Sequence, residues 1–179
     1  MSRSVRFLRC VSGAAAAEMA LVLPLLVLLI CSCIELGNYF MDEHRLIKAL
    51  RDGARYAARQ SLSNYTGCTG TPGSTVVTNT QNIVMSGLLA GGNNNLANMT
   101  TSNITVSIVG CTTTVGSGSG AQTVGGLYNG LKNGSGTAIG APIVQVSASV
   151  PYAAALRAFG WSGYGLTLNA SQQAAVTGW

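Results

Sequence analysis

Acidic side chains and histidine are almost absent from most of this sequence of 179 residues. All five Asp and Glu residues lie at or before Asp52, and the single histidine is His44. The rest of the chain therefore has no carboxylate for a general acid–base pair, a Ser-His-Asp triad or a carboxylate metal site. Asp42 and Glu43 precede His44 directly, a spacing that does not put the three side chains on one helix face. We predict that the protein is not an enzyme and binds no metal or cofactor.

Charge of either sign is scarce, at 8% of the sequence against roughly 25% in ordinary soluble domains. The net charge is +5, but the bases do not form one patch. Three of them, Arg3, Arg6 and Arg9, precede an apolar run, and most of the others share residues 45–59 and their flanks with acids. This distribution indicates membrane topology signals and a solvated helix face. We expect no nucleic-acid partner.

Long apolar runs are also few, but one stands near the N-terminus. Residues 1–13 form a short basic leader, and residues 14–36 form an apolar segment. As a helix rising about 1.5 Å per residue, this segment reaches roughly 34 Å, enough to cross the hydrocarbon core of a bilayer. Its one proline, Pro24, opens a backbone bond, which membrane helices tolerate where a neighbouring helix packs. We therefore predict a single-pass transmembrane helix.

Residues 37–60 continue with helical periodicity. Charged residues lie opposite an apolar stripe and pair at spacings of three and four. The stripe consists of Phe40, Ile47, Leu50, Ala54 and Ala57. Gly37 weakens the helix only locally, and no clear stop separates this amphipathic extension from the apolar segment. We predict one long helix from about residue 14 to 60, with its first half in lipid and its second half outside the membrane.

Residues 61–179 predict an extracytoplasmic domain that contains β-structure. β-Branched residues and partial alternation indicate strands at 74–78, 103–110, 142–150 and 166–176, and residues 81–91 suggest a short helix. Loops rich in Gly, Asn and Ser follow at 91–95 and 116–120. Trp161, Tyr164 and Trp179 suit core packing, subunit packing or a binding surface. The predicted fold class is α+β, a long N-terminal helix followed by a small β-rich domain.

Two cysteines bear on the orientation of the chain. Cys68 and Cys111 are the only cysteines in residues 61–179, and a pair in such a domain suits an oxidising compartment. They either form a disulfide or remain two unrelated thiols. The unopposed arginines of the leader and the acids that follow the apolar segment favour the same topology. We expect the N-terminus in the cytoplasm and residues 61–179 in the periplasm or outside the cell.

A carboxylate stands inside the apolar run, where insertion costs about 2.5 to 3.5 kcal/mol at the centre of a span and less near its edge. A basic leader, then Gly13, then four alanines precede this residue, Glu18. The arrangement resembles the class III signal of type IV prepilins. That resemblance implies cleavage by a prepilin peptidase between Gly13 and Ala14. It also implies that Glu18 sets subunit register by pairing with the terminal amine of a neighbouring subunit.

A longer resemblance covers residues 13–60. The stretches GAAAAEMALVLPLLVLLI, IELGNYF and HRLIKALRDGARYAA resemble the TadE-like minor pilins, or pseudopilins, of tight-adherence (Flp-type) pilus systems. Ala17 and Met19 replace the usual Val and Phe of that family. The matching positions are Gly13, Glu18, Ala20, Pro24, Glu35, Gly37, Ala49, Arg51, Gly53, Ala54, Arg55 and Ala57.

The resemblance implies a structural subunit with roles in pilus assembly, adhesion and secretion. Its expected location is the inner membrane, from which it primes or joins the pilus. Its expected partners are the membrane, the prepilin peptidase, other pilin subunits and the inner-membrane assembly platform. Pro24 and Gly37 are expected to allow close helix packing. Two alternatives stay open: an uncleaved bitopic protein with a ligand-binding outer domain, and a lipoprotein that begins at Cys33.

Overall fold

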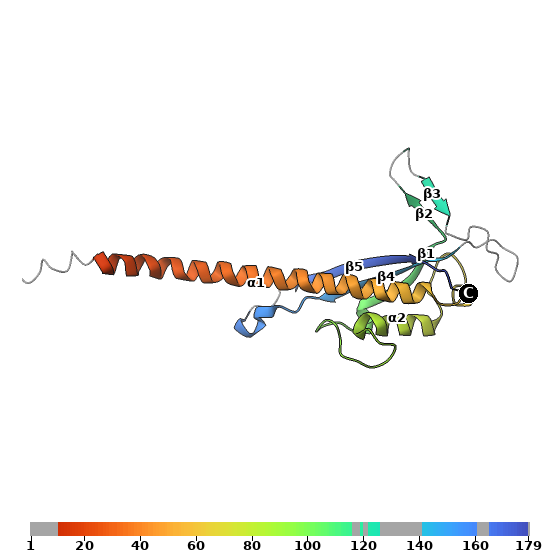
Figure 1. Ribbon diagram of the computed structural model, residues 1–179, viewed down its shortest axis with the longest axis horizontal. Helices are drawn as coiled ribbons and strands as arrows, with labels where there is room; N and C mark the ends of the chain where they lie inside the picture. Colours follow the sequence, from red (N-terminus) through yellow and green to blue (C-terminus); the bar gives the residue numbers. More distant parts are fainter. Residues whose placement is uncertain (1–10, 116–118, 120–121, 126–140, 161–164, 179) are drawn as a thin grey trace, which may run out of the picture.

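The computed structural model describes residues 11–115, 119, 122–125, 141–160 and 165–178. Its dominant element is α1 (Val11–Ala58), a continuous helix of 48 residues. The first half of α1 stands clear of the other described elements, and its second half packs with the following elements into a head (Figure 1). We use "head" for α1 from Glu35 onward together with the elements that follow it. This arrangement confirms the predicted α+β fold with a long N-terminal helix.

A three-stranded antiparallel sheet forms one layer of the head. It consists of β1 (Ile104–Gly110), β4 (Ile143–Pro151) and β5 (Thr167–Ala175), in the order β1-β4-β5. These strands agree with the predicted stretches at 103–110, 142–150 and 166–176. The pairing of β4 with β5 runs without interruption, whereas β1 has a bulge between Ile108 and Gly110. Apolar and polar residues alternate along β1 and β4, so one face of the sheet is buried and the other is open.

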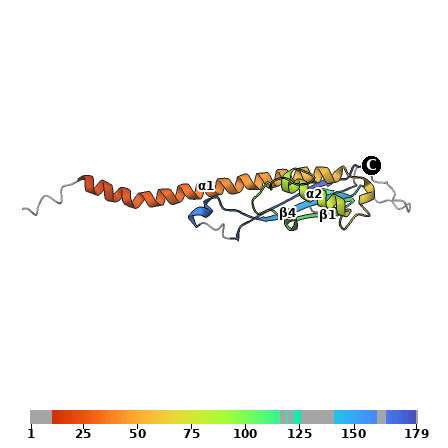
Figure 2. The same ribbon diagram turned by 90° about the horizontal axis from the view of Figure 1, so that it is seen from below.

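Two helices cover the buried face of the sheet. The second half of α1 lies along β4 and β5, and α2 (Ser74–Ser86) lies beside it (Figure 2). Leu50, Ala54 and Ala57 of the predicted stripe are buried there. Two other members of the stripe do not join the core, since Phe40 is 50% exposed and Ile47 is only partly buried. Leu46 and Ala49 take part instead, because α1 contacts both α2 and the sheet and needs a broader apolar face than one stripe.

The prediction of a strand at residues 74–78 is wrong. These residues begin α2, and the helix predicted at 81–91 ends at Ser86. Val76, Thr80 and Val84 recur every four residues and form the buried face of α2. The β-branched side chains favour a strand only weakly, and packing against α1 overrides that preference. Gly87 ends the helix in the left-handed conformation (φ 77°), which glycine adopts without steric penalty.

Gly53 lies where α1 and α2 pack closely together. A Cβ atom at this position would lie 2.5 Å from Cγ2 of Val84, which is fully buried. We expect Gly53→Ala to lower the free energy of unfolding by up to about 2 kcal/mol, because overpacking outweighs the ~1 kcal/mol gain in helix propensity. Urea unfolding of the full chain in detergent measures this change. A stabilised Gly53→Ala variant would contradict the packing argument.

The same substitution at Gly37 is a matched control in the same helix. Nothing lies within 4 Å of a Cβ atom built at Gly37, so Gly37→Ala is expected to be neutral or to stabilise the chain by up to about 1 kcal/mol. Combining Gly53→Ala with Val84→Ala removes the clashing methyl group. The double variant is therefore expected to lose less than the sum of the two single losses.

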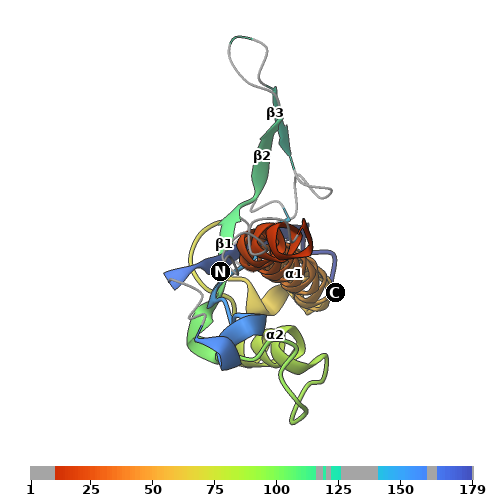
Figure 3. The same cartoon turned by 90° about the vertical axis from the view of Figure 1, so that its left-hand side faces the viewer.

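Further short elements complete the head. They are η2 (Leu62–Asn64), η3 (Thr101–Asn103) and η5 (Ala155–Phe159), with a hairpin of β2 (Thr112–Val115) and β3 (Gln122–Gly125). The hairpin was not predicted, and it projects away from the sheet and helices (Figure 3). The predicted loop at 91–95 has no regular structure, whereas 116–120 lies outside the described residues except for Ser119. Trp161, Tyr164 and Trp179 lie outside them as well.

The turn after α1 is fixed by Tyr65. Its side chain is 2% exposed, and its hydroxyl donates a hydrogen bond to the carbonyl oxygen of Ala57. Burial raises the pKa of Tyr65 to about 12, with a smaller contribution from Tyr56. The hydroxyl therefore remains a donor at all physiological pH values. This bond holds the chain against the end of α1 as it turns toward α2.

Candidate functional site at the base of the head

The first half of α1 presents apolar side chains to its surroundings on every side. The exposed set comprises Met19, Leu21, Val22, Leu23, Leu25, Leu26, Val27, Leu28, Leu29, Ile30 and Ile34. Each of these side chains is at least 47% exposed. Among the described residues, α1 is the one helix long and apolar enough to cross a membrane. A helix that is apolar all round and unpacked is typical of a membrane span.

The residues of the predicted signal lie at the start of this helix. Gly13 is already helical, and Glu18 is exposed in the apolar half of α1. The first turn of a helix lacks internal hydrogen-bond acceptors for its N–H groups, and Gly13 weakens it further. A protease that needs an extended backbone would therefore unwind little structure here. Pro24 and Gly37 are both exposed on α1, and no described residue lies within 4 Å of a Cβ atom built at Gly37.

Glu35 marks the point where α1 meets the head. Its side chain is turned inward and only 8% of the residue is exposed. The hydroxyl of Tyr152 donates a hydrogen bond to Oε1 over 2.8 Å. The backbone N–H groups of Ala155 and Leu156 donate to Oε1 and Oε2, each over 3.1 Å. These three donors replace the water that a buried carboxylate loses, and they tie η5 to α1. We call this arrangement the Glu35 clasp.

Tyr152 links the clasp to the next turn of α1. Asn38 donates a hydrogen bond to the Tyr152 hydroxyl oxygen over 2.9 Å, and the ring of Tyr39 meets that of Tyr152 edge to face at 5.2 Å. Burial raises the pKa of Tyr152, the hydrogen bond from Asn38 acts in the opposite direction, and the Glu35 carboxylate adds to the rise. The Tyr152 hydroxyl is therefore protonated, the state that donates to Glu35.

The other end of the head is held by a disulfide. Cys68 and Cys111 are bonded across a sequence separation of 43 residues. Close to this bond, Gly70 pairs with Ile108 on the outer edge of β1. The segment that follows α1 is thus attached to β1 by a covalent bond and a backbone bond. Cys31 and Cys33, in the apolar half of α1, are free.

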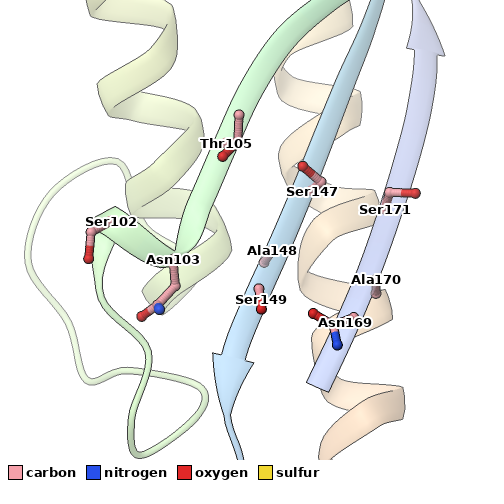
Figure 4. A pocket seen from close by; sticks show the side chains of 9 residues that line it. All are labelled: Ser102, Asn103, Thr105, Ser147, Ala148, Ser149, Asn169, Ala170 and Ser171. Atoms are coloured by element: carbon pink, nitrogen blue, oxygen red, sulfur yellow. The ribbon is translucent and has the colours of Figure 1, made fainter. Parts of the chain in front are cut away.

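The outer face of the sheet carries a shallow hollow of about 740 Å³ (Figure 4). Small polar side chains from all three strands project from this face. The lining comprises Ser102, Asn103, Thr105, Ser147, Ala148, Ser149, Asn169, Ala170 and Ser171. None of these side chains is charged, so the hollow offers hydrogen bonds without acid–base chemistry. Within the described ranges, His, Cys, Asp and Glu form no group of three that could hold a metal ion.

The structure thus separates the residues that the sequence singled out. Gly13, Glu18 and Pro24 lie on the free half of α1, whereas Cys68 and Cys111 lie in the head. Sequence reasoning named Glu35 only as a position that matches the family resemblance and assigned it no structural role. The one signal was an isolated carboxylate among apolar residues in a predicted span. Its partners lie 117 to 121 residues away, so they could not be named in advance.

One protein-family model matches part of the chain. Residues 13–55 match the family model described as TadE-like protein. The match covers most of α1 and none of the sheet, and it agrees with the resemblance derived above. No curated protein and no solved structure matches the chain. The family suggests a role in tight-adherence pilus systems, and it is a structural family without enzymatic activity.

Proposed function

We propose that this protein is a minor pilin or pseudopilin that takes part in the assembly of a tight-adherence pilus. It is made as a precursor, cut by a prepilin peptidase after Gly13, and held in the inner membrane by α1. The N-terminus lies in the cytoplasm, and the head lies on the opposite side of the inner membrane. The observation that carries this proposal is the free apolar half of α1, with Glu18 near its start and the family match along its length. Such a rod can leave the bilayer for a filament core without rearranging the head.

Processing is the direct test. The N-terminal mass of the protein from membranes, with and without the prepilin peptidase, is expected to show a chain that starts at Ala14 only when the peptidase is present. Gly13→Val is expected to block the cut, because a β-branched side chain enters a narrow protease cleft less readily than glycine. A start at Met1 in both strains would refute processing, and a start at Cys33 would make the protein a lipoprotein.

The role of Glu18 is tested separately. Glu18→Val is expected to spare membrane insertion and cleavage, because it replaces a carboxylate with an apolar side chain. It is expected to impair co-assembly with other pilins strongly, because the acceptor for a neighbour's terminal amine is lost. Glu18→Gln keeps the size and shape of the side chain but removes its charge, so it shows which of these properties co-assembly requires. Normal piliation in the Glu18→Val strain would rule out a role in register.

The hollow on the outer face of the sheet favours a second candidate function. An uncleaved membrane anchor with a head that binds an uncharged polar ligand would use that hollow through its serine, threonine and asparagine side chains. The N-terminal mass also decides between these functions. An intact N-terminus favours the ligand-binding anchor, and a start at Ala14 favours the pilin.

A further inference from the structure

The apolar surface of α1 continues beyond Glu35, the first charged residue after Glu18. Leu36, Phe40 and Met41 are 50% to 57% exposed. Between Glu18 and Asp42 the only charged residue is Glu35, and its carboxylate is enclosed by the head. The surface from Met19 to Met41 is thus free of exposed charge over about 33 Å at 1.5 Å per residue. That length matches the hydrocarbon core of a bilayer, at about 30 Å.

The base of the head consequently lies at the level of the membrane surface. The Glu35 clasp holds η5 beside the part of α1 that carries Leu36 and Phe40. Figure 1 shows this turn, in blue, as the part of the head nearest to the free half of α1. Since Glu35 lies six residues, about 9 Å, before Met41 along α1, η5 reaches at least the lipid headgroup layer if residues 19–41 span the bilayer. The residues at the base of the head are therefore expected to face lipid headgroups.

A hollow of about 680 Å³ opens at this base. It lies between the end of β4, η5 and the start of β5, and its lining includes Arg157, Ala153 and Leu166. Leu166 is 53% exposed and Arg157 is exposed as well. In the part of the chain that the structure describes, no carboxylate forms an ion pair with Arg157. A cation with an apolar neighbour at a membrane surface matches the phosphate and the upper acyl chain of a phospholipid.

We propose that this hollow binds the headgroup of an anionic phospholipid from the membrane that α1 spans. Arg157 donates hydrogen bonds to the lipid phosphate, and Leu166 contacts the start of the acyl chains. The lipid thereby fixes the height of the head above the bilayer until the subunit leaves for a filament. This inference rests on the membrane anchorage in the proposed function and not on peptidase cleavage or pilus assembly.

The test uses the full membrane-extracted chain in nanodiscs of phosphatidylcholine, with or without phosphatidylglycerol. Native mass spectrometry of the protein released from the mixed discs counts the lipids that stay bound. The wild-type chain is expected to retain phosphatidylglycerol in preference to phosphatidylcholine. Arg157→Gln is expected to weaken that retention about tenfold, as expected for the loss of one hydrogen bond between charged groups.

Arg59→Gln provides the matched control. Arg59 is also exposed, but it lies 24 residues beyond Glu35, roughly 36 Å farther from the membrane. This variant is expected to retain phosphatidylglycerol like the wild type. Equal retention by the wild type and Arg157→Gln would overturn the lipid site, and so would displacement of the lipid by inorganic phosphate, which would show a site for free anions. A chain that enters neither kind of nanodisc would refute the membrane anchorage itself.

Discussion

Replacing Glu35 with alanine is expected to lower the free energy of unfolding of the head by about 3 kcal/mol or more. The reason is that the substitution removes the side-chain acceptor of three donors that are buried or half-buried. They are the hydroxyl of Tyr152 and the N–H groups of Ala155 and Leu156. The Tyr152 hydroxyl keeps the backbone carbonyl oxygen of residue 35 as an acceptor, at 3.2 Å in the wild type. The two N–H groups lose theirs, at about 1 to 3 kcal/mol each, and water entering the site recovers part of that cost. Urea unfolding of the full chain in detergent, with the slope m compared between variants, measures the loss.

Two variants calibrate this result. Tyr152→Phe removes one donor and leaves the two backbone bonds in place, so its expected loss is about 1 kcal/mol. Asp52→Ala removes another carboxylate of α1. This carboxylate is exposed, and its Oδ1 lies 3.9 Å from Nη1 of Arg55 in a long surface ion pair. Its expected effect is within about 0.5 kcal/mol. If Glu35→Ala cost no more than Asp52→Ala, the clasp would not stabilise the head.

The loss of the clasp has a second expected consequence at the membrane. Without the Glu35 carboxylate, η5 loses the two backbone hydrogen bonds that tie it to α1 and is expected to open locally. Limited proteolysis of the detergent-solubilised chain is then expected to cut near Arg157 sooner in Glu35→Ala than in the wild type. The two readouts are independent, because local opening at η5 does not require unfolding of the sheet.

Loss of the disulfide between Cys68 and Cys111 is expected to destabilise the head by up to about 4 kcal/mol. This value follows from the loop that the bond closes, with a sequence separation of 43 residues, in the chain-entropy model. The double variant Cys68→Ser with Cys111→Ser avoids leaving one unpaired thiol. Its unfolding midpoint in urea is expected to equal that of the wild-type chain treated with a reductant.

The free cysteines supply the control for the reductant. Cys31 and Cys33 lie in the apolar half of α1 and form no disulfide. A Cys31→Ala, Cys33→Ala variant is therefore expected to lose as much stability on reduction as the wild type. An unchanged midpoint after complete reduction, verified by thiol labelling, would show that the bond contributes nothing. In cells, protection of Cys68 and Cys111 from thiol reagents is expected if the head lies in an oxidising compartment.

The elements that could be predicted from the sequence are those with strong local patterns. The long helix follows from an apolar run joined to an amphipathic one, and β4 and β5 follow from alternation in stretches without charge. The start of α2 could not be predicted in this way, because its β-branched residues favour a strand until the packing of Val76 and Val84 against α1 is known. The β2–β3 hairpin was missed because threonine- and glycine-rich segments also suit loops.

The site shows the same division between local and distant information. The motif around Gly13 and Glu18 is contiguous, so it could be recognised from the sequence. The Glu35 clasp joins α1 to backbone groups of η5, and backbone donors leave no signature in the identity of the side chains. The closeness of Gly53 to Val84 likewise appears only when the two helices are brought together. These contacts depend on the tertiary fold.

Because α1 is one continuous helix, a change of bend in its apolar half moves the whole head. The one residue in this helix that removes a backbone hydrogen bond is Pro24, which lies in the free apolar half. From there to Ala58 the helix extends about 51 Å, and the head is fixed to its far part by core packing and the Glu35 clasp. A change of about 10° in the bend at Pro24 would swing the far end of the head by about 9 Å. A small adjustment among helices inside the bilayer would therefore produce a large displacement of the sheet and its hairpin outside the membrane.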